Sequence, residues 1–127
     1  MKLLLTVSAV FEVLTGIGLI VFPSRVISLL IGTLPDSAVV ATLARIAGAA
    51  LISLGIACWL LRNNAASTGI IKAMLFYNLA AAASLLYASI ADKLSGTGLW
   101  PTVLLHTGLA VWCFIVISQH KETIKGM

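Results

Sequence analysis

The chain has 127 residues, of which 61% are hydrophobic and only 9% are charged. Soluble domains carry about 25% charged residues, so this chain has too few charges to cover a surface that faces water. The formal net charge of +4 does not indicate nucleic-acid binding, because the Lys and Arg residues are scattered along the chain. Composition therefore excludes a soluble domain and predicts a single transmembrane domain over residues 1–127, surrounded by the lipid bilayer.

The first candidate span covers about residues 3–22. A helix needs roughly 20 mostly apolar residues to cross a bilayer, and this stretch is long enough. It follows Lys2, as the apolar part of a signal peptide would, but Glu12 interrupts it and no small-residue cleavage site follows. We therefore expect a retained first span.

The segment at about 24–32 is apolar but too short to cross a bilayer. Pro23 separates it from the first span, and we expect it to lie in the membrane interface on the outer face. Pro35 and the pair Asp36–Ser37 then lead into the second span, with a capping residue at its start.

Three further stretches are long and apolar enough to span: about 39–61, 70–91 and 99–118. Pro101 falls in the first turn of the last one, where its missing N–H does little harm. Short connections force neighbouring helices to be antiparallel. The sequence thus predicts an all-α fold, an integral membrane four-helix antiparallel bundle with a short interfacial segment after the first span.

The basic residues indicate an orientation. One set flanks the span ends that share a side: Lys2, Arg62, Lys72, Lys121 and Lys125. Arg25 and Lys93 mark the opposite side. Two acidic residues, Asp36 and Asp92, also lie on that side. Because cytoplasmic loops carry the excess of Lys and Arg, we expect both termini in the cytoplasm and the protein in the cell inner (cytoplasmic) membrane. The tryptophans Trp59 and Trp100 then fall near opposite interfaces.

Each span carries one strongly polar side chain, and the four are Glu12, Arg45, Asn78 and His106. At a rise of 1.5 Å per residue, all four lie within about 7 Å of the midplane. We expect them to form one polar intramembrane cluster that serves as a binding site. In this cluster Glu12 and Arg45 would be an ion pair, with Asn78 and His106 beside them.

Helical spacing and small residues support inward-facing polar stripes. Two sets share a helix face: Ser8, Glu12 and Thr15 in the first span, and Thr102, His106, Ala110 and Cys113 in the last. Small residues, which let helices approach closely in lipid, occur at Gly16, Ala44, Gly48, Gly55 and the AAAAS run of 80–84. The pattern predicts a tight bundle with a polar centre.

Two interpretations of this centre stay open. In the structural one, the cluster is a buried ion pair with completed hydrogen bonds, since a lone charge at mid-bilayer costs about 2.5–3.5 kcal/mol. In the functional one, Glu12 is a working group, because ionisable side chains inside membranes often line proton or substrate paths. Tyr77 and Tyr87 are most simply packing or interface residues.

No pattern in the chain supports catalysis or a bound cofactor or metal. His106 and His120 do not share a depth, as a bis-histidine haem would require, and no Ser-His-acid spacing is present. Cys58 and Cys113 are expected to be buried thiols, without a disulfide. We therefore expect no enzyme activity and no cofactor.

Two family resemblances can be stated. The segment AVFEVLTG (9–16) resembles the glutamate segment of the small multidrug resistance transporters, which are similarly short, have four spans and carry an essential glutamate midway along the first. The resemblance implies that Glu12 is the proton-exchanging, cation-binding carboxylate of a dimeric antiporter. The third span departs from that family in lacking its tryptophan and glycine-rich character, and Arg45 would neutralise the charge that binds cations.

The second resemblance is to small, uncharacterised bacterial four-span membrane proteins of the DoxX-like sort. It rests on GIGLIVFPSRVISLLIG (16–32), in which the first span ends at a proline, and on ARIAGAALISLGIACWL (44–60). It implies a fold and a membrane location rather than an activity.

We therefore expect a non-catalytic integral membrane protein, an accessory subunit or small binding module of a membrane complex. The alternative is a proton-coupled small-molecule or cation transporter that acts as a homodimer, with Glu12 as the titrating carboxylate. Under both, a homo-oligomer or a larger membrane-protein complex is expected, because one small bundle has little room for a permeation path.

Overall fold

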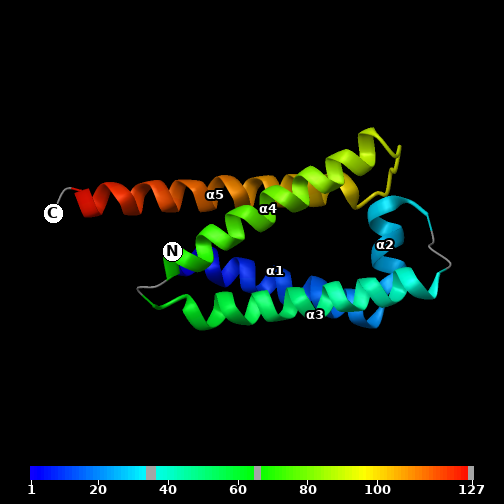
Figure 1. Cartoon of the computed structure of the whole chain (residues 1–127), viewed down its shortest axis with the longest axis horizontal. Coiled ribbons are helices and arrows are strands. Elements are labelled where there is room, and N and C mark those ends of the chain that lie inside the picture. Colours follow the sequence, from blue (N-terminus) through cyan, green and yellow to red (C-terminus); the bar gives the residue numbers. More distant parts are fainter. Residues whose placement is uncertain (34–36, 65–66, 126–127) are drawn as a thin grey trace.

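The computed structural model describes residues 1–33, 37–64 and 67–125, with side chains described as far as His120. Over these residues the chain is 86% helical and without strands. The described helices are α1 (Lys2–Val21), α2 (Pro23–Ile31), α3 (Ala38–Leu61), α4 (Ser67–Ile90) and α5 (Leu99–Lys125) (Figure 1). Some residues used in the predictions lie outside this description: Pro35, Asp36 and the side chains of Lys121 and Lys125.

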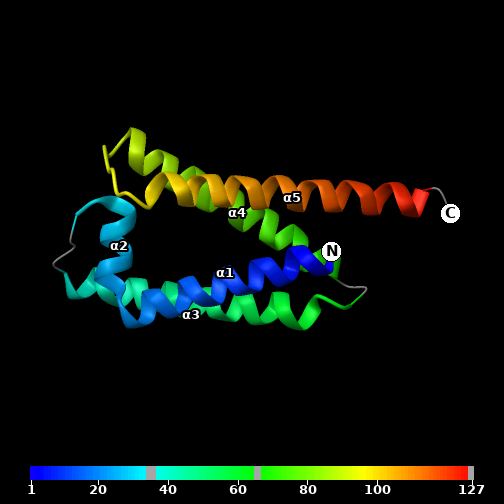
Figure 2. The same ribbon diagram turned by 180° about the vertical axis from the view of Figure 1, so that it is seen from behind.

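Among the described helices, four are long and apolar enough to cross a membrane: α1, α3, α4 and the part of α5 from Leu99 to His120. Their bounds lie within a few residues of the four predicted spans. Consecutive long helices run in opposite directions, and both chain ends lie at the same end of the molecule (Figures 1 and 2). The fold is that of a multi-pass membrane protein.

The short segment predicted at 24–32 is the helix α2. Pro23 is its first residue, a position where the N–H has no intrahelical partner in any case. Gly32 ends it with a φ of +82°, a left-handed conformation that a residue without Cβ adopts at no steric cost. α2 turns across the end of the molecule opposite the two termini (Figure 1).

The four long helices form two pairs: α1 packs along α3, and α4 packs along α5. In the first pair the backbones approach closely, because a Cβ on Gly16 would lie 2.6 Å from the Gly48 carbonyl oxygen and a Cβ on Gly48 would lie 2.6 Å from that of Gly16. About two turns further along α3, Gly55 lies against the Ala9 carbonyl and Val13. The glycines and alanines of the first and second spans thus pack as predicted.

The two pairs meet through an apolar core near the terminal end of the molecule. Leu4 and Leu5 of α1, Cys58 of α3, Met74 of α4 and Cys113 of α5 belong to this core, and each is almost fully buried. Van der Waals contacts between these densely packed side chains hold this end together, since lipid leaves no hydrophobic driving force between helices. Elsewhere the pairs make few contacts with each other.

The bundle is therefore less tight than predicted. The alanine run 80–84 illustrates the reason, because only Ala82 of this run is buried while Ala80, Ala83 and Ser84 are exposed. Close approach is achieved within the α1–α3 pair, where glycines on both helices face each other, and not between the pairs. Space is left between them toward the α2 end.

At that end, the loop before α5 holds α2 in place. The backbone N–H of Gly98 donates to the Leu29 carbonyl at 2.8 Å, and that of Ser95 donates to the Ile31 carbonyl at 3.4 Å. These bonds satisfy carbonyls in the last turn of α2, which have no partner within the helix. Gly96 is buried against the backbone of Leu29 and Leu30, where a side chain would not fit.

Candidate functional site

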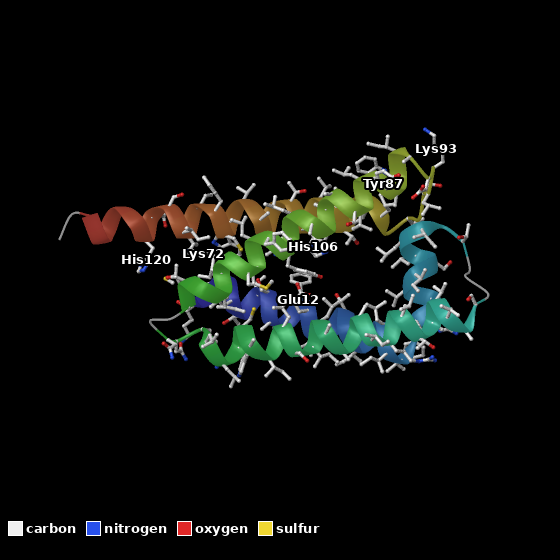
Figure 3. All side chains as sticks on the ribbon, viewed as in Figure 1. Glu12, Lys72, Tyr87, Lys93, His106 and His120 are labelled. Carbon is white, nitrogen blue, oxygen red and sulfur yellow. The ribbon has the colours of Figure 1, made fainter. Side chains whose placement is uncertain are left out.

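A cavity of about 410 Å³ lies between the two helix pairs, bounded by α1, α2, α4 and α5. Apolar side chains form most of its wall, among them Leu14, Val26, Leu29, Leu105 and Leu109. The polar part of the wall comes from Glu12, Thr15, Tyr77, Thr102 and His106. Figure 3 shows Glu12 and His106 midway along the molecule, on facing helices of different pairs.

Glu12 is placed at this wall by the spacing of α1. Its neighbour one turn back, Ser8, is fully buried in the apolar core, and Thr15 lines the cavity. Glu12 itself is 3% exposed. The Tyr77 hydroxyl of α4 lies close enough to interact with its carboxyl group.

Asn78 and His106 form the second polar contact of the site. The Asn78 side-chain Nδ2 donates to the Met74 carbonyl at 2.7 Å, which fixes the direction of the amide. Its Oδ1 then faces Nδ1 of His106 at 2.8 Å. A carbonyl oxygen can only accept, so Nδ1 of His106 carries the hydrogen. In the neutral ring, Nε2 is then the acceptor.

Tyr77 connects these two contacts. Its ring meets the His106 ring edge to face, with centroids 5.6 Å apart and an interplanar angle of 83°. Aromatic pairs favour this geometry because the positive ring edge meets the negative ring face. Glu12, Tyr77, His106 and Asn78 thus form one contiguous group on α1, α4 and α5, which we call the polar group below.

The polar group presents hydrogen-bond acceptors to the cavity. A carboxylate accepts at two oxygens and about four lone-pair sites, and the neutral His106 ring offers its Nε2. The Thr102 hydroxyl uses its hydrogen on the Gly98 carbonyl at 2.7 Å, which leaves its oxygen as an acceptor. Such a wall complements a molecule that brings hydrogen-bond donors.

The cavity reaches the outer surface of the molecule beside α1. Phe11 and Leu14 line it and are nevertheless 42% and 63% exposed. In a membrane this side faces lipid, since α1 is one of the candidate spans. A molecule entering from this side would arrive from the bilayer rather than from water.

Arg45 does not belong to the polar group. It is exposed on α3, where its neighbours Ala44 and Gly48 are buried and Gly48 packs against α1. Within the described part of the chain it forms no ion pair with Glu12, so the predicted pair is absent from the structure. Successive residues on a helix are turned by about 100°, so the burial of Ala44 directs Arg45 elsewhere, although its depth is similar.

Tyr77 is the site residue that the sequence prediction missed. The sequence indicates a packing or interface residue, but Tyr77 lines the cavity and interacts with Glu12 there. The sequence signal for this role is its position beside Asn78 in the middle of the third span, because a buried phenol hydroxyl usually finds a hydrogen-bond partner. Tyr87, near the end of α4, is 67% exposed. The contribution of α2 to the cavity wall was also not foreseen.

The remaining polar and metal-binding side chains do not extend the site. Cys58 and Cys113 are free and buried in the apolar core. The Ser8 hydroxyl has no hydrogen-bond partner in the described part of the chain. Among the described residues, no three His, Cys, Asp or Glu side chains are grouped so that they could hold a metal ion.

No protein-family model, no curated protein and no solved structure is significantly similar to this chain. The resemblances to DoxX-like proteins and to small multidrug resistance transporters therefore stay predictions.

Proposed function

We propose that this protein is a non-catalytic binding module of the membrane, which holds a small, largely apolar molecule with a hydrogen-bond donor in the cavity between its helix pairs. The observation that carries the proposal is the placement of Glu12, buried at the wall of an otherwise apolar cavity of about 410 Å³. Ligand pockets are typically apolar with a few placed polar groups, and begin at about 300 Å³.

The chemistry of the wall narrows the ligand class. The Glu12 carboxyl, Nε2 of His106 and the Thr102 oxygen are acceptors, so an amine, an ammonium or a hydroxyl on the ligand would complete their hydrogen bonds. A ligand with a carboxylate would instead place its acceptor oxygens against the acceptors of the wall. The apolar remainder would contact Leu14 and α2.

The binding test compares three probes of equal chain length, an alkylamine, an alkyl alcohol and an alkyl carboxylate, added to the protein in nanodiscs. We expect the amine and the alcohol, but not the carboxylate, to raise the unfolding temperature. The effect of the amine should be lost in Glu12→Gln. As a control, Arg45→Gln, which changes a charged residue outside the polar group, should bind like the unchanged protein. Equal effects of all three probes would contradict the proposal.

As an accessory subunit, the protein would act by presenting this ligand or its own helices to a larger membrane complex or to a second copy. The exposed face of α3 that carries Arg45 supports a partner, because a charge directed at lipid is costly unless it reaches the interface or finds a counter-ion. A native pull-down in mild detergent, followed by mass spectrometry of co-purifying proteins and small molecules, tests this part. Recovery of the protein alone at monomer mass would contradict it.

A proton-coupled transporter, acting as a homodimer, is the second candidate. The observation in its favour is that Glu12 has no cationic partner in the described part of the chain, so Arg45 does not neutralise it. In proteoliposomes with an imposed proton gradient, a transporter would move tetraphenylphosphonium, and Glu12→Gln would keep the fold and abolish this movement. Ligand binding without gradient-driven movement would favour the binding module.

We propose that the protein lies in the inner membrane with both termini in the cytoplasm. Lys72 lies toward the end of the molecule that carries the termini and Lys93 toward the α2 end (Figure 3). By their places in the helices, Lys2 and Arg62 belong to the first end and Arg25, in α2, to the second. The positive-inside rule then supports this orientation. A membrane-impermeant thiol reagent applied to intact cells should label Ser37→Cys and spare Asn63→Cys. Labelling of both from the same side would contradict the arrangement.

A further inference from the structure

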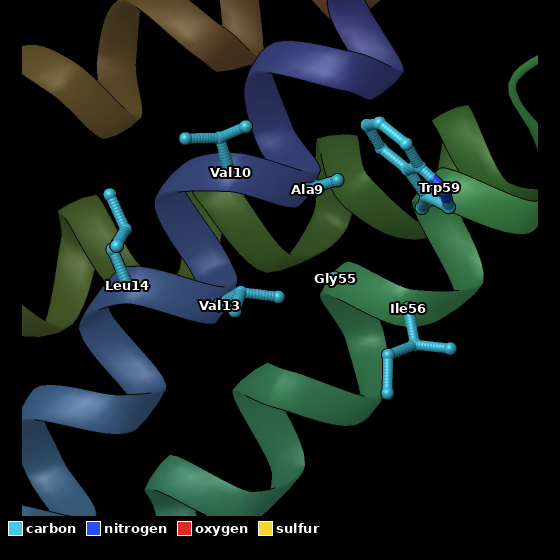
Figure 4. Close-up of a pocket in the computed structure, with 7 residues that line it drawn as sticks. All are labelled: Ala9, Val10, Val13, Leu14, Gly55, Ile56 and Trp59. Carbon is cyan, nitrogen blue, oxygen red and sulfur yellow. The ribbon is translucent and has the colours of Figure 1, made fainter.

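A second hollow, of about 380 Å³, lies on the outer side of the first helix pair, away from the polar group. Ala9, Val10 and Val13 of α1 form one wall, and Ile56 and Trp59 of α3 form the other (Figure 4). Gly55 forms the floor, where α3 lies in close contact with α1: a Cβ on Gly55 would lie only 2.8 Å from Cγ2 of Val13 (Figure 4). Apart from the Trp59 indole N–H, every side chain in this groove is hydrocarbon.

One end of the groove carries a positive charge. The guanidinium of Arg62 lies over the Trp59 ring, with Cζ 3.3 Å from the ring centroid. Its Nη1 donates to the Trp59 carbonyl at 2.8 Å, so the side chain is held at the C-terminal end of α3. Lys2, at the start of α1, lies at the same end of the molecule (Figure 1).

This combination matches one class of molecule. The groove is half-exposed at Val10, Ile56 and Trp59, which is the surface that faces lipid in a spanning helix pair. A guanidinium has five N–H donors in a planar fork that suits phosphate oxygens. In Arg62 one nitrogen is used on the Trp59 carbonyl, which leaves the other N–H donors of the fork for a ligand beside Trp59.

We propose that this groove is a binding site for a phospholipid with an anionic headgroup. One acyl chain lies between α1 and α3 over Gly55, against the indole of Trp59, and the headgroup phosphate contacts Arg62. The site does not depend on the cavity between the helix pairs or on its ligand. A basic residue near the membrane surface favours anionic lipid by about five-fold, so a preference of about that size is expected.

The experiment uses tryptophan fluorescence, because Trp59 forms part of the groove. In a variant with Trp100→Phe and Trp112→Phe, Trp59 is the remaining tryptophan. The protein is reconstituted in mixtures of phosphatidylcholine with a phospholipid that carries bromine on its acyl chains, either phosphatidylglycerol or phosphatidylcholine. Bromine quenches a tryptophan that it touches. We expect brominated phosphatidylglycerol to be favoured about five-fold at Trp59, and Arg62→Gln to abolish this preference.

Two controls separate this site from general attraction to a basic surface. Lys72→Gln removes a charge at the same end of the molecule but on the second helix pair, and should leave the preference at Trp59 unchanged. A variant that keeps Trp100 alone, which is 56% exposed against 48% for Trp59, should show no preference. If Arg62→Gln does not fold, the protein that keeps Arg62 is measured at about 1 M salt instead. Its preference for brominated phosphatidylglycerol at Trp59 should then fall, because salt screens exposed charges.

Equal quenching by the two lipids, a preference that persists in Arg62→Gln or at high salt, or a similar preference at Trp100 would each overturn the proposal. Protection of Trp59 from both brominated lipids would also overturn it, because a protein segment, such as a second copy of the chain, would then fill the groove.

Discussion

The Tyr77 hydroxyl lies close enough to the Glu12 carboxyl to interact with it, where the second helix pair meets the first at the wall of the central cavity. The two pairs otherwise make few contacts beyond the apolar core. We expect a hydrogen bond from this hydroxyl to the carboxyl, which would position Glu12 for a ligand.

Removal of the Tyr77 hydroxyl tests this bond. Tyr77→Phe leaves a carboxyl group that is 3% exposed without its donor, so we expect a loss of about 1–3 kcal/mol in the free energy of unfolding. The measurement is reversible unfolding in mixed detergent micelles, followed by circular dichroism. The matched control is Tyr87→Phe on the same helix, where the side chain is 67% exposed and the change should stay within about 0.5 kcal/mol. Equal losses in the two variants would contradict the bond.

The contact between Asn78 and His106 makes a second prediction. Asn78→Leu leaves Nδ1–H of His106 without its acceptor at 2.8 Å, and His106→Leu leaves Oδ1 of a fully buried Asn78 without its donor. Each should cost about 1–3 kcal/mol, whereas the double replacement removes both partners and should cost less than the sum. A coupling energy of about 0.5–3 kcal/mol from the double-mutant cycle is expected. Additive losses would show that the two side chains do not interact.

A third prediction concerns the pair that the structure does not form. Because Arg45 is exposed on α3 whereas Glu12 is buried, the variants Glu12→Gln and Arg45→Gln should have additive effects on stability, within about 0.3–0.5 kcal/mol. The same unfolding assay measures the cycle. A coupling of several kcal/mol would mean that the two charges meet after all, since separation of a buried ion pair typically costs about 3–5 kcal/mol.

The contrast between Glu12 and Arg45 shows how far the sequence could lead. Depth along a helix follows from a fixed rise per residue, so the four spans, the short segment at 24–32 and the burial of Glu12 and Asn78 were predictable. The direction in which a side chain points around the helix axis depends on which neighbouring helix packs against its own helix. On α3 that choice is made by Ala44, Gly48 and Gly55, and it turns Arg45 outward.

The same limit explains Tyr77 and the cavity. A tyrosine in a span can pack in the core, lie at the membrane interface or belong to a functional site. Only the position of α4 relative to α1 brings Tyr77 to Glu12. The cavity itself follows from uneven packing, which is close where Gly16 meets Gly48 and open where α4 passes α1. Composition and periodicity describe each helix alone, so they do not contain this difference.

The glycines of the first helix pair make the last prediction. A Cβ on Gly16 would lie 2.6 Å from the Gly48 carbonyl oxygen and 3.1 Å from the Ile52 backbone nitrogen. Because backbone atoms cannot move aside as a flexible side chain does, Gly16→Ala should force α1 and α3 apart and cost about 1–3 kcal/mol of unfolding free energy. Gly108, inside α5, has no neighbouring atom within 4 Å of a Cβ, so Gly108→Ala should keep only the helix-propensity gain of up to about 1 kcal/mol. The two identical substitutions are thus expected to have opposite signs in the same unfolding assay. Stabilisation by both would mean that the α1–α3 backbones lie further apart than the structure has them, and the groove over Gly55 would then be wider as well.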